Sequence, residues 1–75
     1  MALVSKGPTA EAVEEFRAAS RLKPDYVAAH YNAGVTLGKL GRYKEAVEEF
    51  GAVLRLNPGL ASARQNLDYY AGLAR

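Results

Sequence analysis

Cysteine is absent from the 75-residue sequence, and histidine occurs once, as His30. Without cysteine the chain can form neither a disulfide bond nor a thiolate metal site. One histidine with scattered carboxylates is also a poor ligand set for zinc, which prefers nitrogen and sulfur donors. We therefore expect no metal and no cofactor, and a cytoplasmic location agrees with the missing cysteine.

Concentrated charge and long apolar runs are missing as well. The net charge is +2, and the ten basic side chains are interspersed with eight acidic ones. A nucleic-acid binder typically carries a concentrated basic stripe, and a membrane-spanning helix needs about 20 consecutive apolar residues. The apolar part of residues 1–6 is too short for a signal peptide. The sequence thus predicts neither a nucleic-acid partner nor direct membrane insertion.

What the sequence does contain is an internal repeat. Residues 11–16, EAVEEF, recur unchanged as residues 45–50, at an offset of 34 residues. The same offset relates further pairs: Gly7 and Gly41, Leu22 and Leu56, Pro24 and Pro58, and Asn32 and Asn66. One register that holds along the chain is typical of stacked structural units.

Within each unit the apolar side chains follow a helical period. In the second unit they are Ala46, Val47, Phe50, Val53 and Leu54, which share one helix face. Proline cannot continue a helix, so Pro24 and Pro58 mark helix ends, while Gly41 suits a left-handed stop. Asp25 is expected to cap the helix after Pro24. We predict an all-α fold of about four antiparallel helices, near residues 8–22, 26–40, 43–56 and 60–74.

This helix-turn-helix unit resembles the tetratricopeptide repeat, whose pattern is Trp-x2-Leu-Gly-x2-Tyr, then Ala-x3-Phe, then Pro. The corresponding residues read His30-x2-Ala33-Gly34-x2-Leu37, then Ala46-x3-Phe50, then Pro58. The resemblance implies a single domain over residues 1–75, built as a tetratricopeptide-type α-solenoid. At the position of a core aromatic, His30 is expected to be packed and hydrogen-bonded.

The resemblance also implies how the domain is divided. Residues 7–24 are expected to form the second helix of a truncated repeat, residues 25–58 one full repeat, and residues 59–75 a C-terminal capping helix. The capping helix carries Arg64 and Asp68 on its outer side. These two residues are four apart, so they can pair on a solvated face.

Stacked repeats of this family present a concave surface lined by the first helix of each repeat, and the resemblance implies that a partner binds there. The expected groove residues fall in two stripes with helical spacing. They are Tyr31, Asn32, Val35, Lys39, Gln65, Asn66, Tyr69 and Leu73. Alternatives remain open, since Asn32 and Asn66 either hold a peptide backbone or are simply solvated. Tyr31 and Tyr69 either anchor a partner or cover the seam between helices.

The resulting functional prediction is a non-catalytic scaffold that binds a peptide or protein partner. No catalytic residue is expected, because the adjacent acids Glu14 and Glu15 point in different directions on a helix. One alternative is homo-oligomerisation through Leu3, Val13 and Phe16, which lack cover if no helix precedes residues 8–22. A weaker alternative is a regulatory appendage of a larger enzyme.

Overall fold

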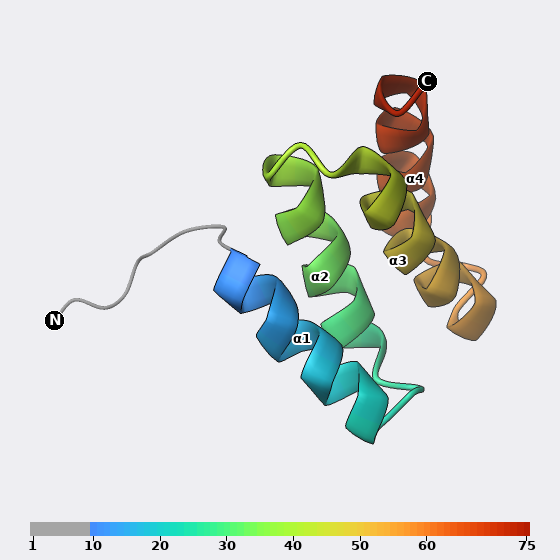
Figure 1. Cartoon of the computed structure of the whole chain (residues 1–75). Helices are drawn as coiled ribbons and strands as arrows, with labels where there is room; N and C mark the ends of the chain where they lie inside the picture. Colours follow the sequence, from blue (N-terminus) through green and yellow to red (C-terminus); the bar gives the residue numbers. More distant parts are fainter. Residues whose placement is uncertain (1–9) are drawn as a thin grey trace, which may run out of the picture.

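The chain folds into four α-helices, as seen in a computed structural model that describes residues 10–75 (Figure 1). They are α1 (Ala10–Leu22), α2 (Val27–Lys39), α3 (Tyr43–Leu56) and α4 (Ala61–Leu73). Successive helices run antiparallel, with α2 between α1 and α3 and with α4 packed against α3. The predicted all-α fold of four helices is confirmed, with no strand among the described residues. Residues 8 and 9, predicted to begin the first helix, lie outside the described part.

The turn between α1 and α2 corrects one prediction. Asp25 does not cap α2, because the N-cap residue is Tyr26 and no side chain caps the helix. The turn closes through backbone atoms instead, since the Tyr26 amide donates to the Lys23 carbonyl at 2.9 Å. The helix therefore begins at Val27, one residue later than it would begin with Asp25 as its N-cap.

The turn between α2 and α3 depends on the backbone freedom of glycine. Gly41 has a φ angle of +83°, in the left-handed region that residues with a Cβ rarely adopt. Its amide donates to the Gly38 carbonyl at 3.1 Å, and the Arg42 amide donates to the Leu37 carbonyl at 2.9 Å. This is the Schellman pattern of hydrogen bonds, which satisfies the last carbonyls of a helix. The left-handed stop predicted at Gly41 is confirmed.

The hydrophobic core receives side chains from all four helices. Its fully buried cluster consists of Val13, Leu37, Ala46, Phe50, Val53 and Ala63. Val13 was expected to lack cover and to contribute to self-association. It is instead fully buried within this cluster.

Aromatic rings fill the core where two glycines make room for them. A Cβ added at Gly34 would lie 2.8 Å from the Phe50 ring, and one added at Gly38 would lie within 3 Å of the Tyr70 ring. Phe50 stacks on Tyr70 with ring centroids 6.1 Å apart, and Tyr31 meets Phe50 edge-on at 5.4 Å. The close approach of α2 to α3 and α4 therefore requires glycine at both positions.

Gly51 lies inside α3 without any such role. A Cβ added there would meet nothing closer than the Arg55 side chain at 3.9 Å, an ordinary van der Waals distance. Glycine in a helix interior costs roughly 0.5–1 kcal/mol relative to alanine. We therefore expect Gly51→Ala to raise the free energy of unfolding by about this amount, measured by urea denaturation followed by circular dichroism. A lower melting temperature would contradict the open space seen here.

Candidate functional site

The eight expected groove residues all lie on α2 and α4, and we call the surface that they form the α2–α4 face. Five of its members are exposed: Asn32, Lys39, Gln65, Tyr69 and Leu73. The other three, Tyr31, Val35 and Asn66, are partly buried. The face thus has an exposed part and a part that packs against the protein itself.

Tyr31 of α2 and Asn66 of α4 form a hydrogen bond between the two helices. The Asn66 side-chain amide donates a hydrogen bond to the Tyr31 hydroxyl at 3.0 Å. The Tyr31 ring packs against the core and contacts Phe50 edge-on. Of the two alternatives for Tyr31, this geometry favours a residue that covers the seam. The two asparagines also differ, because Asn66 is engaged with Tyr31 and Asn32 is exposed to solvent.

A second contact between α2 and α4 was not predicted from the sequence. The Tyr70 ring lies over Gly38, and it stacks on Tyr43 with ring centroids 5.9 Å apart. The sequence shows the glycine, Gly38, within the predicted second helix. It does not show which ring lies over Gly38, because Tyr70 is distant in the sequence. Together with the Tyr31–Asn66 hydrogen bond, this contact fixes α4 relative to α2.

The exposed part of the α2–α4 face combines apolar and polar side chains. Tyr69 is 62% exposed and Leu73 is 45% exposed, and the Tyr69 ring contacts Tyr70 edge-on at 5.0 Å. Lys39 forms no ion pair with any other described residue. No carboxylate belongs to the face, so Lys39 gives it a positive charge. Such a surface can bury an apolar side chain and attract an acidic one.

His30 is packed and hydrogen-bonded, as expected. One ring nitrogen, Nδ1, lies 2.9 Å from the Glu49 carboxylate, and the other, Nε2, lies 3.0 Å from the Pro24 carbonyl. The same carboxylate lies 3.5 Å from the Arg17 guanidinium. Glu49 of α3 therefore connects α1 and α2, and both nitrogens of the only histidine are occupied by structural contacts.

An exposed ion pair lies at the start of α3. The Arg42 guanidinium donates two hydrogen bonds to the Glu45 carboxylate, at 2.5 Å and 3.2 Å. These hydrogen bonds lower the pKa of Glu45 and raise the pKa of Arg42. Because both side chains are exposed, the pair adds little to the stability of the fold.

Arg64 and Asp68, by contrast, form no ion pair with each other in the described part of the chain. Both side chains are exposed on α4, where an ion pair would add little to stability. The pair that the spacing allows is therefore not formed, while both residues are exposed as the solvated face implies.

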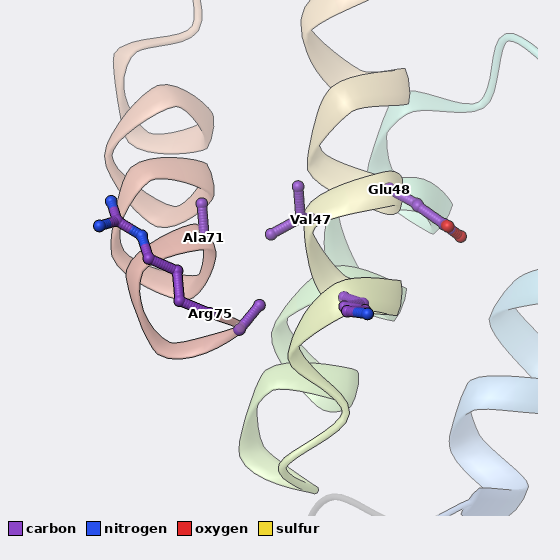
Figure 2. A pocket seen from close by; sticks show the side chains of 6 residues that line it. Val47, Glu48, Ala71 and Arg75 are labelled. Atoms are coloured by element: carbon purple, nitrogen blue, oxygen red, sulfur yellow. The ribbon is translucent and has the colours of Figure 1, made fainter.

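Among the described residues, hollows also lie away from the α2–α4 face, and two of them differ in size. The larger, of about 360 Å³, lies between α3 and α4 and is lined by Lys44, Val47, Glu48, Ala71, Ala74 and Arg75 (Figure 2). In Figure 2, Val47 and Ala71 point into the space between the two helices, whereas Glu48 points away from it. The smaller, of about 240 Å³, is lined by Ser20, Pro24, His30, Ala52, Arg55 and Leu56.

The described residues also limit what chemistry the site can hold. Nowhere in residues 10–75 do three or more His, Asp or Glu side chains gather as a metal site would require. None of the four helices is long and apolar enough to cross a membrane. Leu3, predicted to take part in self-association, lies outside the described residues.

Four antiparallel helices with a 34-residue repeat define a helical-repeat protein of the α-solenoid class. The sequence matches a family described as TPR repeat over residues 2–41 and one described as Tetratricopeptide repeat over residues 27–60. The chain therefore belongs to the tetratricopeptide repeat family, whose members generally mediate protein–protein interaction through a typically non-catalytic fold. No curated protein matches the chain.

Proposed function

We propose that the α2–α4 face binds a peptide segment of a partner protein, as the concave surface of the repeat family does. The observation that carries this proposal is the exposure of Tyr69 and Leu73 on α4 together with that of Lys39 on α2, which pairs with no described carboxylate. Exposed aromatic residues next to polar ones are common at the centres of protein interfaces. Tyr31 is held by Asn66 and Phe50, and Tyr69 contacts Tyr70, so these members of the face are already ordered before a partner binds.

The charges of the face indicate what the segment contains. Lys39 and Leu73 occupy equivalent positions in the repeat, near the C-terminal ends of α2 and α4. A segment with an acidic side chain near Lys39 and an apolar side chain against Tyr69 and Leu73 complements both features. Asn32 and Gln65 are exposed amides, and each offers a donor and an acceptor to the backbone of such a segment.

The test is selection of peptides from a random display library against the 75-residue chain, followed by fluorescence anisotropy with variants. We expect Tyr69→Ala combined with Lys39→Ala to weaken binding at least about tenfold, or 1.4 kcal/mol. The matched control combines Tyr26→Ala and Lys44→Ala, since Tyr26 and Lys44 are also exposed but lie off the face. Equal losses in both double variants, or a library that yields no binder, would contradict the proposal.

Self-association through α1 has less support as the function. Val13 is buried in the chain's own core, which leaves Phe16, partly exposed, as the described residue available for that contact. A role as a regulatory appendage of a larger enzyme stays a prediction.

A further inference from the structure

A hollow of about 240 Å³ lies between the C-terminal ends of α1 and α3, next to the start of α2. Helices α1 and α3 each pack against α2 but not against each other (Figure 1). The hollow is therefore bounded by three described helices and results from their packing. We call it the α1–α3 hollow, and its lining residues are Ser20, Pro24, His30, Ala52, Arg55 and Leu56.

The uncharged polar side chains of the α1–α3 hollow already have partners within the chain. The Ser20 hydroxyl donates to the Arg17 carbonyl at 2.9 Å. The ring nitrogens of His30 lie 2.9 Å from the Glu49 carboxylate and 3.0 Å from the Pro24 carbonyl. Since a polar group that is already hydrogen-bonded gains little from a further partner, these side chains call for no uncharged polar group on a ligand.

The rest of the lining consists of apolar surface and one cation. Pro24, Ala52 and Leu56 supply the apolar part. Arg55 is exposed in the last turn of α3 and forms no ion pair with any described carboxylate. A guanidinium binds a carboxylate through two parallel hydrogen bonds. The lining therefore complements an apolar group that carries one carboxylate.

The space itself is connected with the identity of residue 30. His30 stands where the repeat pattern has tryptophan. An imidazole ring is smaller than an indole ring, and its two contacts hold it beside Glu49 and Pro24. A larger ring at this position would occupy part of the α1–α3 hollow, so the hollow follows from a residue in which this chain departs from the pattern.

We propose that the α1–α3 hollow binds an aromatic or branched apolar group that carries a carboxylate. The apolar part lies against Ala52 and Leu56, and the carboxylate pairs with Arg55. The hollow admits about one such group, because pockets for larger ligands usually measure about 300–1,000 Å³. A small aromatic acid presents this chemistry, and so does a peptide with an acidic residue beside an aromatic one. No lining residue belongs to the α2–α4 face, so the inference does not depend on peptide binding there.

Titration of the isotope-labelled chain with 3-phenylpropionate, followed by NMR, tests the proposal. His30 is the only histidine, so its ring signals report on the hollow without overlap. We expect saturable shifts of these signals and of the Ala52 and Leu56 amides, with a Kd of about 1 mM for so small a ligand. A parallel titration uses glutamyl-phenylalanine blocked at both ends. Binding of either probe at the hollow supports the proposal, and the tighter one identifies the source of the ligand.

The role of Arg55 is tested by comparing 3-phenylpropionate with the neutral 3-phenylpropionamide. The acid should bind about fivefold more tightly than the amide, as expected for an exposed ion pair. Arg55→Gln should remove this preference. Arg21→Gln is the matched control, because Arg21 is the equivalent exposed residue in the last turn of α1, and it should leave the preference unchanged. An equal preference in wild type and Arg55→Gln would overturn the proposed pairing.

Filling the hollow tests its location. His30→Trp introduces the ring of the repeat pattern, and Ala52→Leu adds volume from α3; each should weaken binding of 3-phenylpropionate at least about tenfold. Ala18→Leu is the matched control, because Ala18 is the equivalent of Ala52, is also partly buried and does not line the hollow. If circular dichroism shows that His30→Trp is unfolded, Ala52→Leu decides. Undiminished binding in the folded, filled variants, or no saturable shift at the hollow with either probe, would overturn the proposal.

Discussion

Phe50→Ala is expected to remove about 3–5 kcal/mol from the free energy of unfolding, the largest loss expected from any single substitution in this chain. The Phe50 side chain is fully buried and is the largest side chain in the core. Its ring lies between Tyr31 and Tyr70 and covers Gly34. Truncation therefore removes contacts to α2 and α4 at once and leaves a cavity in the middle of the fold.

This loss is large compared with the whole stability of so small a chain. Seventy-five residues correspond to about 4–11 kcal/mol, at the usual 0.05–0.15 kcal/mol per residue. We expect Phe50→Ala to be substantially unfolded near room temperature, measured by circular dichroism during urea and thermal denaturation. Phe16→Ala is the matched control, because Phe16 is the equivalent residue one repeat earlier and is only partly buried. Equal losses in the two variants would show that the core is not centred on Phe50.

Gly34→Ala is expected to destabilise the fold by about 1–3 kcal/mol, because the added methyl group overpacks the core. The new Cβ would lie between 2.8 and 3.0 Å from three atoms of the Phe50 ring. The ring cannot turn aside easily, since it is fully buried between Tyr31 and Tyr70. The steric cost should exceed the gain of about 1 kcal/mol that alanine brings to a helix interior.

Gly51→Ala is the natural control for Gly34→Ala, because the same substitution is made in a helix interior with free space around it. The two variants should shift the midpoint of urea denaturation in opposite directions, down for Gly34→Ala and up for Gly51→Ala. A shift of the same sign in both would mean that helix propensity, and not the contact with Phe50, determines the outcome.

The positions of the helices could be predicted from the sequence because they depend on nearby residues. Pro24 and Pro58 interrupt the helical pattern, and Gly41 supplies the left-handed residue that ends α2. The third helix was predicted at its observed bounds, Tyr43–Leu56. The prediction that Asp25 caps α2 is wrong, although it also depended on nearby residues. The chain turns there through a backbone hydrogen bond from Tyr26 to Lys23, and no side chain caps the helix.

The candidate site could be predicted only in part. Helical spacing was enough to place Asn32, Tyr69 and the other members on two stripes. It could not show that Asn66 donates to Tyr31, because these residues lie 35 positions apart and meet only through the packing of α2 against α4. The contact of Gly38 with Tyr70 was missed for the same reason. Exposure within the face depends on such long-range contacts.

Amide chemical-shift mapping tests the central claim most directly. The ¹⁵N-labelled chain would be titrated with a peptide selected from the display library, and the shifts would be assigned to residues. Binding on the α2–α4 face predicts the largest changes at Asn32, Lys39, Gln65, Tyr69 and Leu73, with small changes along α1. Largest changes on α1 and α3, or around the hollow lined by residues 47 and 71, would contradict the account.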